Sequence, residues 1–171
     1  MKLIFSISIL ISGLLLVGFN KTAIHNPSIN HQLQTDSVPK MNQLVLDFVN
    51  RNMKKKVGTG ECWDLANGAL KHANATWDGQ YKFGREIDYK KEPVHAGDII
   101  QLEGVILNYE MNGSKYTEKM THHTAIIYTV KDKSIFTIAH QNNGFSGKKV
   151  GISPMDISTV TKGKFKIYRP Q

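Results

Sequence analysis

Helical and strand-like patterns occupy separate parts of this 171-residue chain. Apolar residues recur at steps of three and four from Pro39 to Lys56, and again from Cys62 to Ala73, which predicts two amphipathic helices. After Gly97-Asp98 the chain changes to short β-branched and aromatic runs separated by turn residues, a pattern typical of antiparallel strands. Helices grouped before a run of strands predict an α+β fold.

The strand-rich part divides into predicted hairpins. Asn112-Gly113 is a strong hairpin signal between strands expected over 99–110 and 116–120. Further strands are expected over 123–130, 134–141 and 164–169. Four residues of the first strand are expected to face inward: Ile100, Leu102, Ile106 and Tyr109.

Residues 1–20 differ in kind from the rest of the chain. Lys2 precedes a largely apolar run from Leu3 to Val17. A run of this length resembles the hydrophobic region of a secretory signal peptide more than a membrane span, which needs about 20 apolar residues. We therefore expect a signal peptide, or an N-terminal anchor if it is not cleaved, then a linker over 21–37 and one domain over 38–171. Export would place the domain outside the cell or in the cell envelope, with the leader as its only contact with a membrane.

The chain is basic, with a formal net charge of +8. Such a charge attracts nucleic acids, anionic cell envelopes or acidic polymers. No nucleic-acid-binding motif accompanies it, so we expect no nucleic-acid partner. Attraction to an anionic envelope and a basic surface without a specific partner both remain open. The length suits one domain, which we expect to be monomeric.

The chain has a single cysteine, Cys62. In an exported protein an unpaired cysteine is a buried inert residue, an intermolecular bridge or a reactive thiol. Gly58-Thr59-Gly60 precedes it, and Thr59 is the expected N-cap of the second helix. Cys62 then falls in the first helical turn, where free N–H groups and the helix dipole stabilise an anion. This position favours a nucleophilic thiolate, with the Cys62 backbone N–H as an oxyanion donor, although Cys62 also belongs to the apolar stripe of its helix and suits a buried core position.

A nucleophilic thiol needs a base, and two of the seven histidines are well placed to supply it. His123 and His140 lie eight and seven residues from the two ends of the turn Lys131-Asp132-Lys133. Antiparallel strands joined by such a turn bring these positions to the same end of a sheet, unless the register slips. We expect His123 to accept the proton of Cys62, and either His140 or Asn142 to hold the His123 ring in the required tautomer.

Zinc binding is the competing interpretation of these residues. His122, His123 and His140, with Cys62, offer nitrogen and sulfur ligands. Adjacent residues of a strand point to opposite faces, so His122 and His123 seldom share one ion. We therefore expect no metal ion, and no other cofactor.

Four segments occur in an order that resembles a known superfamily: Gly58–Ala66, Ala96–Ile100, His123–Ile127 and His140–Asn142. They resemble the successive motifs of the CHAP and NlpC-type peptidoglycan hydrolases. The Cys62-Trp63 pair and the ending Ile167–Pro170 are also similar to a cysteine-proteinase-fold domain found in fungal myosin-interacting proteins.

The resemblance implies a papain-like core, in which a helix carrying the nucleophile packs on an antiparallel sheet carrying the base. It also implies hydrolysis of an amide bond, most often in cell-wall peptides. Cys62 and His123 match the family motifs directly. His140 stands where NlpC-type enzymes often have His and CHAP domains usually have Glu, whereas Asn142 matches the CHAP Asn.

Together these features predict an exported cysteine hydrolase acting on a peptide or peptidoglycan-like substrate. Three aromatic residues are candidates for the wall of its cleft: Trp63, Trp77 and Tyr81. The two tryptophans suit a core or surface position equally well. The alternative is a non-catalytic module that binds a peptide or glycan on the same fold.

Overall fold

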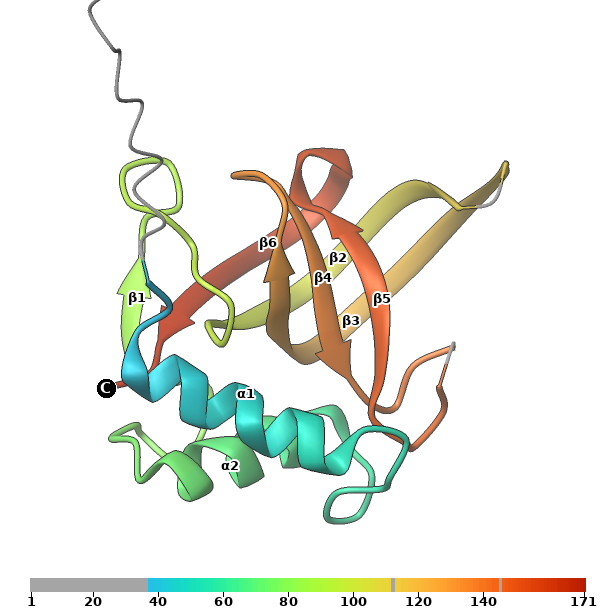
Figure 1. Ribbon diagram of the computed structural model, residues 1–171. Helices are drawn as coiled ribbons and strands as arrows, with labels where there is room; N and C mark the ends of the chain where they lie inside the picture. The colour runs from blue at the N-terminus through green and yellow to red at the C-terminus, as the bar shows by residue number, and fades with distance from the viewer. Residues whose placement is uncertain (1–36, 112, 145) are drawn as a thin grey trace, which may run out of the picture. The chain divides into compact units, whose positions relative to one another are not determined.

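The computed structural model describes residues 37–171 except 112 and 145 (Figure 1). The expected leader over 1–20 lies outside these residues, as does the expected linker as far as residue 36. Among the described residues, neither α-helix is long and apolar enough to cross a membrane.

Two α-helices, α1 (Lys40–Asn52) and α2 (Cys62–Ala73), lie side by side at one end of a curved antiparallel sheet (Figure 1). The sheet has the order β1-β6-β2-β3-β4-β5. Its strands are β1 (Arg85–Ile87), β2 (Ile99–Met111), β3 (Ser114–Val130), β4 (Ile135–His140), β5 (Gly151–Asp156) and β6 (Val160–Arg169). A 3-10 turn, η1 (Ile157–Thr159), links the last two. This architecture confirms the predicted α+β class.

Helix α1 ends at Asn52, four residues before the end that periodicity predicted. Met53 leaves the helical region and pairs with Val150 in an isolated parallel bridge. The Lys54 N–H then donates to the Val150 carbonyl at 2.9 Å, and the Val150 N–H donates to the Lys55 carbonyl at the same distance. The basic run after the helix therefore begins with a turn, in which Lys54 has a φ of +63°, and its backbone hydrogen bonds join the end of α1 to the segment before β5.

The segments 116–120 and 123–130, predicted as separate strands, form the single strand β3. It pairs with β2 as a long hairpin that projects away from the helices, with Met111 opposite Ser114 (Figure 1). His123 therefore lies in the middle of a continuous strand and not at its start.

The inward pattern predicted for β2 was wrong at Ile106, because the strand carries a bulge, whereas Tyr109 is partly buried and packs against the core as predicted. Ile100 and Leu102 are buried as predicted, but beyond Gly104 the buried residues are Val105 and Leu107. Gly104 has a φ of +61°, and the pairing of β2 with β6 shifts by one residue at this point. An extra residue in one strand exchanges its two faces, and Ile106 is turned out of the core.

The buried apolar residues form two clusters on the two faces of the sheet. One cluster packs α1 and α2 against the sheet through residues such as Val49, Leu70 and Ile126. The other lies within the curve of the sheet and includes Ile100, Ile127 and Ile138. Alternate residues of β2, β3 and β4 enter different clusters, so these strands are buried on both faces where the site forms.

A buried polar network fixes the start of β2. The Asp98 carboxylate is fully buried and accepts hydrogen bonds from Asn42 Nδ2, the His95 N–H and Arg169 Nη2, each at 2.8 Å. Gly97 has a φ of +87°, and a Cβ at this position would lie 2.5 Å from the Asn42 carbonyl oxygen. The Ala96–Ile100 motif therefore has a structural role, which is to dock α1 and the end of β6 onto β2.

Candidate active site

Cys62 is the first residue of α2 and is half-buried. The N–H groups of a first helical turn have no acceptor within the helix. Its N-cap is Glu61, so the predicted cap at Thr59 was wrong. Thr59 instead donates its backbone N–H and its hydroxyl to Asp64 Oδ2, at 2.9 and 2.7 Å. Asp64 thereby folds the preceding loop back over the helix start.

Two glycines of this loop permit close packing around Cys62. Gly58 and Gly60 have φ values of +58° and +94°. A Cβ on Gly58 would lie 2.7 Å from Asp64 Cγ, and one on Gly60 would lie 2.8 Å from Lys148 Cβ. The absence of a side chain at Gly60 therefore allows the segment that carries Lys148 to approach the start of α2 closely.

Gln141 holds the same loop against the end of β4. This fully buried side chain donates through Nε2 to the carbonyls of Val57 and Glu61, at 2.9 and 2.7 Å. Its Oε1 accepts from the Val57 N–H at 3.2 Å. These three bonds fix the residue before Cys62 relative to the strand that carries His140.

The predicted pairing of His123 with His140 is present in the structure. His123 Nε2 lies 2.9 Å from His140 Nδ1, and the rings meet edge to face. Ala139 lies opposite Ile126, and continuing this register places His140 opposite Ala125. The two histidines are therefore diagonal neighbours on one face of the sheet, within reach of each other's rings.

A third buried group, Ser153 on β5, completes a row of side chains. Its Oγ lies 2.8 Å from His140 Nε2. Because Nε2 of His123 is occupied by His140, its Nδ1 is the nitrogen left to accept a proton from a thiol. In that tautomer Nε2–H of His123 donates to His140 Nδ1, so the proton of His140 is on Nε2 and Ser153 Oγ accepts it. The row has one consistent direction of hydrogen bonding.

Burial lowers the pKa of both rings, since an imidazolium loses its hydration there. The pKa of His123 falls from the ordinary 6.5 to about 4, mainly through burial and also through the positive charge that His122 can carry. The pKa of His140 falls to about 3, again mainly through burial. Both rings are therefore neutral at physiological pH, the state a general base requires.

Asn142, the other candidate for the third residue, makes a different contact. Its Nδ2 donates to Glu61 Oε2 at 2.5 Å, and its backbone has a φ of +58°. Lys148 Nζ forms an ion pair with Glu61 Oε1 at 2.8 Å. Of the two candidates, His140 contacts His123, whereas Asn142 closes the loop after β4 over the start of α2.

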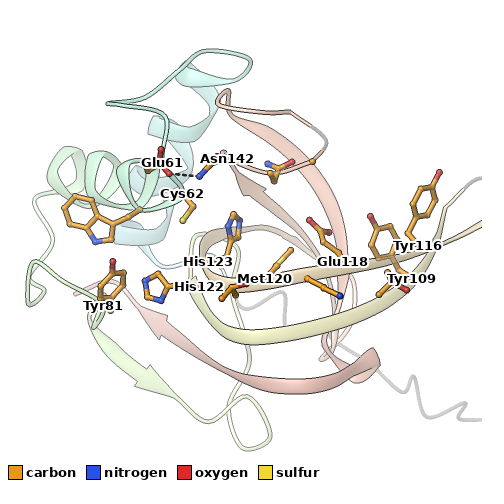
Figure 2. A pocket seen from close by; sticks show the side chains of 16 residues that line it. Glu61, Cys62, Tyr81, Tyr109, Tyr116, Glu118, Met120, His122, His123 and Asn142 are labelled. Carbon is orange, nitrogen blue, oxygen red and sulfur yellow. Dashed lines mark hydrogen bonds between the residues drawn. The ribbon is translucent and has the colours of Figure 1, made fainter.

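An open cavity of about 890 Å³ runs from the start of α2 along β3. Cys62 and His123 line it close to each other, and Glu118 lies farther along the hairpin (Figure 2). Among the described residues, no hydrogen bond joins the Cys62 sulfur to His123. The cavity therefore places the candidate nucleophile, Cys62, and the candidate base, His123, in one accessible groove.

Two of the three aromatic candidates line this groove and one does not. Trp63 does, and its Nε1 donates to the Gln80 carbonyl at 2.7 Å. Tyr81 does too, with its ring edge-on to His122 at 4.5 Å between centroids. Trp77 instead packs between Trp63 and Phe83, against the apolar cluster that joins α1 and α2 to the sheet. It is a packing residue, as one interpretation of the sequence allowed.

Within the part of the chain that the structure describes, no group of three His, Cys, Asp or Glu side chains is arranged to hold a metal ion. The ring of His122 does not join the buried pair of His123 and His140. Its Nδ1 lies 2.9 Å from Glu103 Oε2.

Three contributors were missed from the sequence. Ser153 lies outside any motif, and Gln141 lies within the His140–Asn142 motif but was assigned no role; only the pairing of β5 with β4 and the contacts of the loop before α2 reveal the two residues. Glu118 is also outside any motif, although it lies on the same strand as His123. The signal that existed was the alternate spacing of Glu118 and Met120 along the strand predicted over 116–120.

A cysteine at a helix start, facing a histidine on an antiparallel sheet, defines a papain-like cysteine-proteinase fold. The chain belongs to the AIM3/BBC1 cysteine proteinase-fold domain family, whose sequence model matches residues 24–171. This confirms the resemblance that the Cys62-Trp63 motif indicated.

A relative and two solved structures are similar to the chain. Altered inheritance of mitochondria protein 3 of Debaryomyces hansenii is 30% identical over 150 residues, which cover 77% of this chain and 16% of that protein. The crystal structure of Ly7917 shares 18% identity with a TM-score of 0.45, over 74% of this chain and 62% of that one. The structure of Ly7917 with the hydrolyzing product of MDP shares 21% identity with a TM-score of 0.44, over 75% and 63%. The chain thus spans a minor part of the curated relative and less than two thirds of either solved chain.

Proposed function

We propose that this domain is a cysteine hydrolase that cleaves an amide bond in a peptide. The observation that carries the proposal is the row His123, His140 and Ser153, which leaves Nδ1 of His123 for the thiol of Cys62. A buried inert cysteine would have no need of an oriented base beside it. The half-buried position of Cys62 in a groove supports the same conclusion.

In the proposed reaction His123 Nδ1 takes the proton of Cys62 as the sulfur attacks the substrate carbonyl. The N–H of Cys62, at the positive end of α2, stabilises the oxyanion that forms. His123 then gives its proton to the leaving amine, and the acyl group remains on sulfur. A water molecule, deprotonated by His123, releases the acid and restores the thiol.

Each member of the row has one role in this scheme. His140 holds the His123 ring in the tautomer that keeps Nδ1 free, and Ser153 does the same for His140. Trp63 and Tyr81 form the wall of the groove beside the reacting bond. Export to the cell envelope and a cell-wall peptide as substrate, both expected from the leader and the motif resemblance, belong to this proposal.

The direct test is incubation of the full chain with peptide libraries and with purified peptidoglycan, followed by detection of new amines and mass spectrometry. Cys62→Ala and His123→Ala are expected to lower turnover by about 10³-fold or more. His72→Ala is the matched control, because His72 is exposed in the last turn of α2. Turnover that is equal in the full chain and in Cys62→Ala would refute the hydrolase.

A second candidate function is a binding module that retains the groove without turnover. Two observations favour it: in the part of the chain that the structure describes, the sulfur of Cys62 has no hydrogen bond to His123, and burial together with the nearby His122 lowers the pKa of His123 to about 4. A low pKa makes the imidazolium of the proposed intermediate harder to form. Peptide binding by calorimetry without product release, unchanged in Cys62→Ala, would support this alternative.

A further inference from the structure

Glu118 is the unusual carboxylate of the groove. It lies on β3 opposite Leu107 and lines the cavity that also contains Cys62. Its Oε2 atom is buried and has no hydrogen-bond partner among the described residues. Leaving a buried acceptor unsatisfied costs about 1–3 kcal/mol, and more when the group is charged. Such an atom in a native structure calls for a partner that binds there.

The other glutamates near the groove have partners within the chain. Glu61 pairs with Lys148, and Glu103 pairs with His122. Glu118 differs, since burial raises its pKa and, among the described residues, it forms no ion pair with a cation. The site therefore offers a carboxylate whose missing partner is a hydrogen-bond donor or a cation.

The surroundings of Glu118 favour a cation over a neutral donor. Tyr109 and Tyr116 face each other across β2 and β3, and their rings stack with centroids 5.4 Å apart. Both tyrosines line the groove beside Glu118, with Met120 on the other side (Figure 2). Aromatic faces next to a carboxylate attract an ammonium group through the ring quadrupole as well as the charge.

We propose that Glu118, Tyr109 and Tyr116 form a subsite for a primary ammonium group of an extended peptide. The inference deepens the proposed function, because it names a substrate feature read by the same groove. Glu118 is five residues from His123 along β3, which at about 3.3 Å per residue amounts to roughly 16 Å. The recognised amine, on a lysine side chain or a free N-terminus, therefore lies about four to five residues from the scissile bond.

The subsite is tested by binding, with the full chain carrying Cys62→Ala so that nothing is cleaved. The probes are extended peptides of equal length with lysine, acetyl-lysine or norleucine at one scanned position. At the matching position the lysine peptide is expected to bind about tenfold more tightly than the other two. Glu118→Gln, which removes the charge at nearly constant shape, is expected to abolish this difference.

Glu110→Gln is the matched control, because Glu110 is an exposed carboxylate of the same hairpin and lies opposite Lys115. This variant is expected to keep the preference for lysine. Thermal melts check folding, and Glu118→Met, which suits the apolar neighbours Leu107 and Met120, provides a second variant without the charge. A lysine preference that persists in both Glu118 variants, or equal binding of all three peptides, would overturn the subsite.

The outcomes separate the subsite from the hydrolase. Turnover by the full chain with no preference for lysine at any position leaves the proposed function in place and removes the subsite. Binding that depends on lysine and on Glu118, in a chain without turnover, leaves the subsite in place and removes the hydrolase.

Discussion

His123 and His140 meet edge to face, with Nε2 of the first 2.9 Å from Nδ1 of the second, although 17 positions separate them in the chain. The two rings are buried and neither contacts a carboxylate in the described hydrogen bonds. The orientation of the base is therefore set by a neutral ring, in the position where many acid-base sites have an Asp. This arrangement makes the tautomer of each ring depend on its neighbour.

Replacing His140 is expected to impair the base without removing it. In His140→Ala the Nε2 of His123 loses its partner, and both tautomers of His123 become populated. We expect kcat to fall about 100-fold, at the lower end of general-base effects, with little change in KM. Steady-state kinetics on the best peptide of the library measure both constants.

His140→Gln is the informative companion variant, because its amide oxygen can accept from Nε2–H of His123. It is expected to recover part of the lost kcat. An alanine variant with the kcat of the parent chain would show that His140 does not orient the base.

Ser153→Ala tests the far end of the row. The change leaves His140 Nε2–H buried without an acceptor, which is expected to lower the free energy of unfolding by about 1–3 kcal/mol. It also frees the tautomer of His140, so the nitrogen NMR signals of both imidazoles should shift. Ser153→Thr keeps the hydroxyl and is expected to preserve those signals. Unchanged signals in Ser153→Ala would contradict the directional row.

The stability of the fold is expected to fall in mild acid because of the two histidines. Their folded pKa values, about 4 and about 3, lie below the ordinary 6.5 of the unfolded chain. As the pH falls through 6.5, the unfolded chain binds protons that the folded chain does not. From pH 7 to pH 5 each histidine therefore lowers the free energy of unfolding by about 2 kcal/mol.

Urea denaturation at pH 7, 6 and 5 measures this dependence. The double variant His123→Gln/His140→Gln is expected to lose most of the slope, whereas His72→Gln, on the exposed face of α2, is expected to keep it. A double variant with the full slope would assign the acid sensitivity to other groups.

Gly60→Ala is expected to damage both the fold and the nucleophile. The residue has a φ of +94°, and the new Cβ would lie 2.8 Å from Lys148 Cβ. Backbone strain and the clash together should lower the free energy of unfolding by about 2–4 kcal/mol. The rate at which iodoacetamide alkylates Cys62 should also change, because the loop positions the start of α2.

Gly79→Ala separates the two causes. Gly79 has a φ of +74°, but a Cβ there would meet nothing within 4 Å. This variant is expected to lose about 1 kcal/mol of stability from strain alone and to keep the alkylation rate of Cys62. Equal effects of the two substitutions would show that contact with Lys148 is unimportant.

Local patterns were sufficient to predict that two helices precede the sheet and to place Cys62, but β1 and β5 were not predicted. Helix periodicity and the glycines before it fixed that residue in the first turn of α2. The pairing of His123 with His140 was also predictable, because one short turn connects their strands. These features depend on neighbours that are close in the sequence.

The features that were missed depend on the register between strands. Ser153 reaches His140 only because β5 pairs with β4, and nothing in its own surroundings indicates this. Asn142 resembled an orienting residue by motif, but a left-handed backbone turns it toward Glu61. The bulge at Gly104 reversed the faces of β2 in a way that simple alternation does not foresee.

Two consecutive residues at the end of β4 serve the two halves of the candidate site. His140 holds the base, while Gln141 holds the loop that leads into Cys62. A shift of β4 would displace His140 Nδ1, which accepts from His123, and also Gln141 Nε2, which donates to the carbonyls of the loop before Cys62. The positions of Cys62 and His123 therefore both depend on two consecutive residues. We expect a substitution that displaces this pair to disrupt both halves of the candidate site together.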